Sequence, residues 1–238
     1  YTVYLAPDRK TKKSSGTKAR YITAMRAREM RNTAIVPGDL VDVVGDTSGK
    51  EGTLARIVRL QPRETVLRRS ADDKDAYERV VVANADTLVI VVAAANPEPR
   101  TGFIDRAMVA AYDAGIAPVL CITKTDLADP ARLIEHYDHL DLEIFTIGPI
   151  NPESDTNHEA PILHPADLDA LQDRLAGHIS ALIGPSGVGK STLLNALTGA
   201  DRAVGAVNVV TGRGRHTSSS IALLADCLEL VPQLVLIR

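Results

Sequence analysis

The sequence predicts a small all-β unit followed by a larger α/β unit with a mostly parallel sheet. Three observations lead to this fold class. Short apolar stretches separated by turns fill the first 60 residues, apolar runs alternate with amphipathic helices after residue 80, and a glycine-rich segment joins a strand to a helix near residue 184. The 238 residues, of which 45% are hydrophobic and 24% charged, are enough to bury two such cores.

The all-β unit is expected over residues 1–70. Four short strands with no helix between them are predicted, at residues 1–5, 20–25, 40–44 and 52–60. Pro37-Gly38-Asp39 and the segment 45–49 supply turns between them. Several short strands in succession favour a small barrel, and the five-stranded oligonucleotide-binding barrel (OB-fold) is the natural candidate.

Positive charge is concentrated in this unit. Residues 1–31 hold nine basic and two acidic side chains, whereas the whole chain has a net charge of −3. Segregated positive charge attracts phosphate backbones through counterion release and electrostatic steering. The alternative is a solvated, flexible arm. The aromatic side chains before residue 70 are Tyr1, Tyr4 and Tyr21, so backbone contacts would dominate over base stacking in any contact with nucleic acid.

A charged linker is predicted at residues 71–80, and an α/β unit over residues 81–238. Buried parallel strands are expected at residues 88–93, 118–122, 143–147, 179–183 and 234–237. Crossover helices are expected at residues 104–114, 131–139, 166–175 and 190–197.

A phosphate-binding loop (P-loop) follows the predicted strand 179–183. The segment 184–191, GPSGVGKS, matches the pattern G-x-x-x-x-G-K-[ST] in full, between a strand and a helix. Glycines let the loop turn its amide groups inward, Lys190 reaches the outer phosphates, and Ser191 offers a hydroxyl to Mg²⁺. The predicted phosphate-binding residues are Gly184, Pro185, Ser186, Gly187, Val188, Gly189, Lys190, Ser191 and Thr192.

A second motif indicates which base is bound. Thr123-Lys124-Thr125-Asp126 follows the predicted strand 118–122 and resembles the guanine-specificity motif N-K-x-D of regulatory GTPases. Guanine presents a ring N–H and an exocyclic amine side by side, and the carboxylate of Asp126 accepts from both. Lys124 is expected to lie over the nucleotide and to tie this segment to the P-loop. Threonine at position 123 removes the amide that usually braces the site.

The two motifs stand in an unusual order. Lys124 precedes Lys190 by 66 residues, whereas ordinary GTPases carry the base motif downstream of the P-loop. With the barrel-like N-terminal unit and the segment 211–217, TGRGRHT, the chain resembles the circularly permuted GTPases that act on the small ribosomal subunit, the RsgA (YjeQ) family. The resemblance implies a circularly permuted P-loop GTPase domain with a mostly parallel sheet, preceded by an OB-fold-like domain that binds rRNA and the ribosome.

The resemblance also implies roles for residues of the first switch. His216 matches the histidine that positions the attacking water, although a histidine between arginines can also be a surface residue or an RNA contact. Thr217, or a neighbouring hydroxyl, would join Ser191 as a Mg²⁺ ligand when the γ-phosphate is present. Lys190 is the second catalytic candidate, through the charge it places on the phosphates.

Three features of the family are not found in this sequence. The second switch, D-x-x-G, would begin where the chain ends at Arg238. The zinc module with its cysteine and histidine ligands is missing, because Cys121 and Cys227 stand far apart. The Ser-Ala loop that contacts the guanine carbonyl is replaced by Gly148-Pro149. Zinc is therefore expected of the family but not of these residues, and we expect the chain to bind nucleotide better than it hydrolyses it.

The function expected from the resemblance is a GTPase stimulated by the ribosome. It would bind GTP or GDP with Mg²⁺, contact the rRNA of the small subunit late in its maturation, and use hydrolysis as a release switch. One alternative is an ATP-dependent phosphotransferase in which residues 123–126 match by accident. The other is an RNA-binding module with little hydrolysis. Lone cysteines and the lack of a long apolar stretch predict a cytoplasmic protein without membrane contact, and a monomer is expected.

Overall fold

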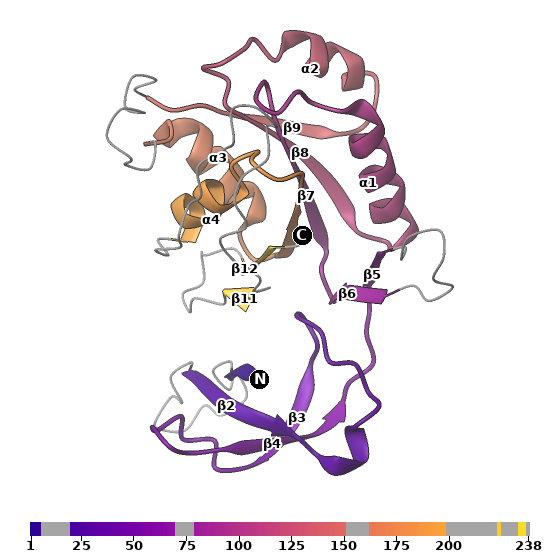
Figure 1. Ribbon diagram of the computed structural model, residues 1–238, viewed down its shortest axis with the longest axis vertical. Helices are drawn as coiled ribbons and strands as arrows, with labels where there is room; N and C mark the ends of the chain where they lie inside the picture. Colours follow the sequence, from indigo (N-terminus) through magenta and orange to yellow (C-terminus); the bar gives the residue numbers. More distant parts are fainter. Residues whose placement is uncertain (6–19, 70–78, 151–161, 199–222, 225–232, 237–238) are drawn as a thin grey trace.

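The computed structural model describes residues 1–5, 20–69, 79–150, 162–198, 223–224 and 233–236. Within these ranges the strands form three sheets (Figure 1). The N-terminal sheet has four strands in the order β1-β2-β4-β3, a ribbon pairs β5 with β6, and a six-stranded sheet has the order β11-β12-β10-β7-β8-β9. None of the helices in these ranges is long and apolar enough to cross a membrane.

The N-terminal sheet confirms the four strands predicted for this region. They are β1 (Thr2–Leu5), β2 (Arg20–Arg26), β3 (Val41–Gly45) and β4 (Ala55–Leu60). β2 runs parallel to β4, and the other neighbours are antiparallel. Ile22 and Ile57 point inward and form a small core with Met30 of the short helix η1 (Arg28–Met30). Alternation along the strands leaves the other face to solvent.

The ribbon of β5 (Val66–Arg69) and β6 (Arg79–Ala83) flanks the predicted linker and was not anticipated. The two strands are antiparallel, with Leu67 opposite Val82. Both side chains are buried in the same cluster as Leu88 and Ile104. The ribbon therefore shares the core of the large sheet, and we call the ribbon, the large sheet and its helices the C-terminal unit.

The large sheet is parallel except at one edge. Its strands are β7 (Thr87–Ala93), β8 (Ala117–Thr123), β9 (Glu143–Ile147), β10 (Ile179–Ile183), β11 (Leu223–Leu224) and β12 (Gln233–Leu236). Only β11 is antiparallel to its neighbour among these strands. The five parallel strands confirm the predicted mostly parallel sheet, and β7 and β10, separated by more than 80 residues, are neighbours at its centre.

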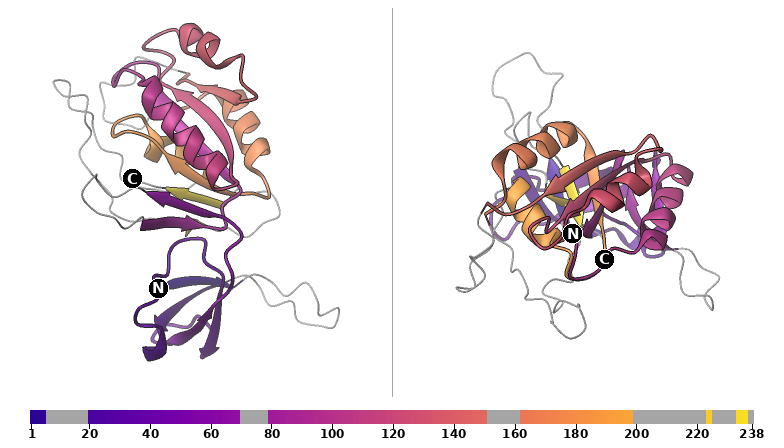
Figure 2. Two further views of the ribbon diagram at one scale, coloured as in Figure 1. Left: turned by 90° about the vertical axis from the view of Figure 1, so that its right-hand side faces the viewer. Right: turned by 90° about the horizontal axis from the view of Figure 1, so that it is seen from above.

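Helices cover both faces of this sheet, as Figures 1 and 2 show. They are α1 (Thr101–Asp113), α2 (Ala131–Tyr137), α3 (Pro165–Leu175) and α4 (Lys190–Thr198). Side chains of β7 alternate between the two faces: Ile90 packs in one cluster with Ile104 of α1, and Val91 packs in the other with Leu193 of α4. A strand buried on both faces reads as a continuous apolar run, which is why its position could be predicted.

Candidate functional site

Loops that follow parallel strands gather at the carboxyl edge of the large sheet. The P-loop follows β10, and β7, next to it, is followed by Ala94. Lys124 follows β8, and Gly148 follows β9. Because β10, β7, β8 and β9 are consecutive and parallel, the phosphate motif and the base motif lie at one edge, where ligands of such sheets bind.

The conformation of the P-loop explains its glycines. Gly187 and Gly189 have φ angles of 82° and 89°, which side chains other than glycine rarely adopt. Gly184 lies so close to β7 that a Cβ atom there would overlap the carbonyl oxygen of Val91. Val188 is 1% exposed and anchors the loop in the apolar cluster beneath α4.

The lysine of the motif is folded over the loop. Its Nζ donates to the carbonyl oxygens of Gly184, at 2.7 Å, and Pro185, at 2.6 Å. Helix α4 begins at this lysine, and its first turn is closed by the N–H of Leu193 donating to the carbonyl of Gly189. The positive end of the helix and the Lys190 ammonium therefore meet at the same loop, an arrangement that suits a phosphate chain.

Thr123 connects the base motif to the P-loop. Its side chain is buried, and its hydroxyl lies 2.6 Å from the carbonyl oxygen of Val188 and 3.1 Å from that of Val92. A hydroxyl donates one hydrogen at a time, and the shorter distance assigns it to Val188. The amide of the usual motif is absent at position 123, as expected, and the threonine hydroxyl supplies a brace of its own.

Lys124 and Asp126 lie beyond the end of β8. Lys124 has a φ angle of 56°, and its Nζ donates to the carbonyl oxygen of Asn96, in the loop after β7, at 2.5 Å. Asp126 is exposed, so its carboxylate is open to a ligand. The next acidic residue, Asp129, accepts from the N–H of Ala131 at 3.0 Å at the start of α2. The two carboxylates of this loop therefore have different surroundings.

Gly148 is a site residue that neither sequence motif contains. A Cβ atom at this position would overlap the hydroxyl of Thr125, so the turn after β9 rests against the base motif. The same turn is held by the N–H of His164, which donates to the carbonyl of Gly148 at 2.9 Å. Glycine followed by proline directly after a predicted strand was the signal available in the sequence.

The described residues fit a nucleotide and one Mg²⁺ ion. Ser191 stands in the first turn of α4, beside the lysine that faces the loop carbonyls. No group of three histidine, cysteine, aspartate or glutamate side chains in the described ranges could hold a metal ion. Mg²⁺ bound through phosphates, water and one or two protein oxygens does not require such a group. His216 and Thr217 lie outside the described residues, as does the whole segment 211–217.

Comparisons with known proteins identify the family of the chain. The family model described as RsgA GTPase matches residues 60–227. The small ribosomal subunit biogenesis GTPase RsgA of Pseudomonas aeruginosa (strain LESB58) is 40% identical over 193 residues, which cover 80% of this chain and 52% of that protein. The protein of the same name from Gemmatimonas aurantiaca is 35% identical over 206 residues, covering 84% and 62%. The chain thus spans about half the length of the first of these relatives.

Solved structures are similar as well. The crystal structure of YjeQ from Thermotoga maritima is 25% identical with a TM-score of 0.58, and the match covers 92% of this chain and 67% of that one. YloQ, described as a circularly permuted GTPase, is 22% identical with a TM-score of 0.51, covering 76% and 57%. The latter similarity bears on the fold alone, and it matches the permuted order of the two motifs.

Proposed function

This chain belongs to the RsgA GTPase family, and on that premise we propose that it binds GTP and hydrolyses it to GDP and phosphate. The observation that carries the proposal is the bond between Thr123 and Val188, which joins a P-loop to a guanine-type motif at one sheet edge. A P-loop by itself does not choose between adenine and guanine. The link to a motif ending in Asp126 is what favours guanine.

Each site residue has a proposed task. The backbone of Gly184 to Gly189, with Thr192, surrounds the phosphates, and Lys190 neutralises their charge. Asp126 reads the base, and Lys124 covers it. Ser191 and Thr217 would hold Mg²⁺, which when bound draws charge from the phosphate oxygens. His216 is proposed to position the attacking water.

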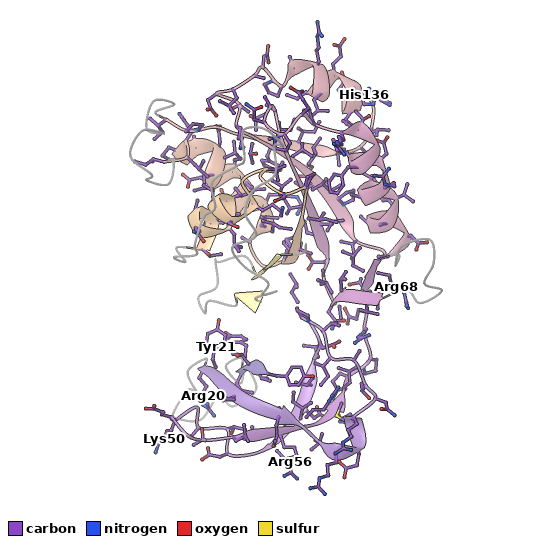
Figure 3. All side chains as sticks on the ribbon, in the orientation of Figure 1. Arg20, Tyr21, Lys50, Arg56, Arg68 and His136 are labelled. Carbon is purple, nitrogen blue, oxygen red and sulfur yellow. The ribbon has the colours of Figure 1, made fainter. Side chains whose placement is uncertain are left out.

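We propose that the small ribosomal subunit stimulates this hydrolysis during its late maturation. The N-terminal sheet, within the predicted range 1–70, would act as the OB-fold-like unit that contacts rRNA, while β5 and β6, on either side of the predicted linker 71–80, pack in the C-terminal unit. Support comes from side chains of the N-terminal sheet: the rings of Tyr4 and Tyr21 lie 5.4 Å apart, and both Tyr21 and Arg56, labelled on opposite sides of the unit in Figure 3, are exposed. Aromatic and basic groups together suit single-stranded RNA.

The test of the base assignment is the variant Asp126→Asn. Xanthine carries a carbonyl where guanine has its amine, so an amide at position 126 should reverse the preference from GDP to XDP. Affinities are measured by titration with fluorescent nucleotides. Asp129→Asn is the matched control, since Asp129 caps α2 and should leave the preference unchanged. A variant Asp126→Asn that still prefers GDP would refute the assignment.

Two other functions make different predictions. An ATP-dependent phosphotransferase would bind ATP as tightly as GTP and turn over a small acceptor. An RNA-binding module would bind rRNA equally well with GTP and GDP, without hydrolysis stimulated by small subunits. The affinities for ATP and GTP, rRNA binding with GTP and with GDP at two salt concentrations, and hydrolysis with and without purified small subunits together separate all three. We further propose that the protein works as a cytoplasmic monomer.

A further inference from the structure

A joint between the two units is centred on Asn84, which follows β6 and precedes β7. Its φ angle is 55°, in the left-handed region that asparagine tolerates better than most residues. The backbone N–H of Asn84 donates to the carbonyl of Thr65 at 2.9 Å. The chain thus turns sharply here, at the amino edge of the large sheet and away from the nucleotide site.

The side-chain amide of Asn84 bridges segments that are distant in sequence. Its Nδ2 donates to the carbonyl of Gly38 in the N-terminal unit at 2.8 Å, and its Oδ1 accepts from the N–H of Glu64 at 2.8 Å. Only one orientation of the amide satisfies both partners, because one is an acceptor and the other a donor. Asparagine is therefore suited to this position by its side chain as well as its backbone.

Gly38 meets the C-terminal unit backbone to backbone. It is buried with a φ angle of 86°, and a Cβ atom there would overlap the carbonyl oxygen of Ala83. The N–H of Ala83 also donates to the carbonyl of Pro37 at 3.0 Å. No side chain separates the two units at this contact, so a small displacement would break it.

The turn that carries Gly38 is itself held in place. The carboxylate of Asp39, whose side chain is 1% exposed, accepts two bonds from Arg63, at 2.7 and 2.9 Å. The same carboxylate accepts from the N–H of Val36 at 2.7 Å. A bidentate pair of this kind fixes orientation as well as distance. The turn that carries Gly38 is thus braced by Arg63, in the segment that connects the two units.

The C-terminal side of the joint continues into the strands that carry the nucleotide site. The hydroxyl of Thr65 donates to the carbonyl of Ala85, and Ala85 belongs to the large core. The N–H of Asp86 donates to the carbonyl of Ile179 at 3.0 Å, and its own carbonyl accepts from Ala117 at 2.9 Å. Ile179 opens β10 and Ala117 opens β8, the strands that end at the P-loop and the base motif.

We propose that Asn84 is a positioning residue that holds the two units in one mutual orientation, and that small subunits stimulate GTP hydrolysis only in that orientation. The second part rests on the proposed function, and the first does not. A partner that contacts both units at once binds more tightly when their geometry is fixed, because the second contact then forms within the same complex. If a variant samples several orientations, only the fraction of molecules in the proposed orientation is stimulated, so the stimulation falls in proportion to that fraction.

Two substitutions of Asn84 separate the side chain from the backbone. Asn84→Gly keeps the positive φ angle and loses both amide bonds. Asn84→Asp keeps the acceptor for Glu64 but cannot donate to Gly38. Asn32→Gly, at an exposed asparagine of the N-terminal unit, is the matched control.

The full chain is assayed with GTP and Mg²⁺ alone and with purified small subunits. In both Asn84 variants the rate of GTP hydrolysis without small subunits should stay unchanged. The factor by which small subunits raise that rate should be about tenfold smaller than in the unsubstituted protein.

A distance measurement tests the orientation directly. Spin labels are placed at Lys50→Cys and Val109→Cys, both exposed, in a Cys227→Ser background. We expect one narrow distance distribution for Asn84 and a broad one for either variant. The proposal would be overturned if the Asn84 variants kept the narrow distance distribution or the full stimulation. It would also be overturned if their rates with and without small subunits fell equally. If small subunits do not stimulate the unsubstituted protein, the proposed function fails and the coupling fails with it, while the distance distributions still decide whether Asn84 holds the joint.

Discussion

Thr123 shows how one hydroxyl can replace the amide of related motifs. Replacing it by valine keeps the shape of the side chain but leaves the buried carbonyl of Val188 without this donor, a loss of about 1–3 kcal/mol. We expect Thr123→Val to lower the affinity for GTP and GDP by roughly tenfold. Thr123→Ser, which retains the hydroxyl, should bind nearly as well. Titration with a fluorescent GDP measures both, and equal affinities for the two variants would contradict the role assigned to this bond.

Cys121 lies in the middle of β8 with its side chain fully buried, and burial raises the pKa of its thiol to about 12. The folded thiol therefore keeps its proton while the unfolded thiol loses it near pH 9.0, so raising the pH above 9.0 favours unfolding. In a Cys227→Ser variant we expect no reaction with a thiol reagent at pH 8 until urea is added. Rapid modification of the native protein would show that Cys121 is accessible.

At the scale of elements, the turn after β9 supports the base motif. Gly148→Ala would place a methyl group against the hydroxyl of Thr125 and displace Asp126, so guanine nucleotides should bind about tenfold more weakly. The double variant Thr125→Ala/Gly148→Ala removes the overlapping hydroxyl and should recover most of the affinity. The single variant Thr125→Ala is the control. Additive losses in the double variant would show that the two residues act independently.

In the C-terminal unit, the sequence predicted those strands whose side chains are buried one after another, because they form unbroken apolar runs. β7 and β8 each run for seven residues, and every residue of β7 is buried. β5 and β6 escaped prediction because they have four and five residues and are flanked by charge. In the same way, the P-loop and Asp126 could be recognised from local patterns. The contacts of Thr123 with Val188 and of Gly148 with Thr125 depend on packing between distant segments, which local pattern does not contain.

At the scale of the whole molecule, packing suggests that the C-terminal unit begins near residue 62. Leu67 is 3% exposed and packs with Val82 in the large core. We expect a fragment of residues 62–238 to unfold cooperatively and to bind GDP like the full chain. A fragment of residues 81–238 lacks Leu67 and should be less stable by about 2–5 kcal/mol. Thermal unfolding compares them, and equal midpoints would place the boundary at the linker.

The strand order has a consequence for how the site forms during synthesis. β7, β8 and β9 are consecutive in the chain and adjacent in the sheet, so residues 87–147 can pair as they emerge. β10 joins later by pairing with β7, and β12 joins after that. Chains fold from the N-terminus as they are made. We therefore expect the edge that carries Asp126 to form before β10 brings the P-loop to it, so that the base-binding part of the site is assembled before the phosphate-binding part.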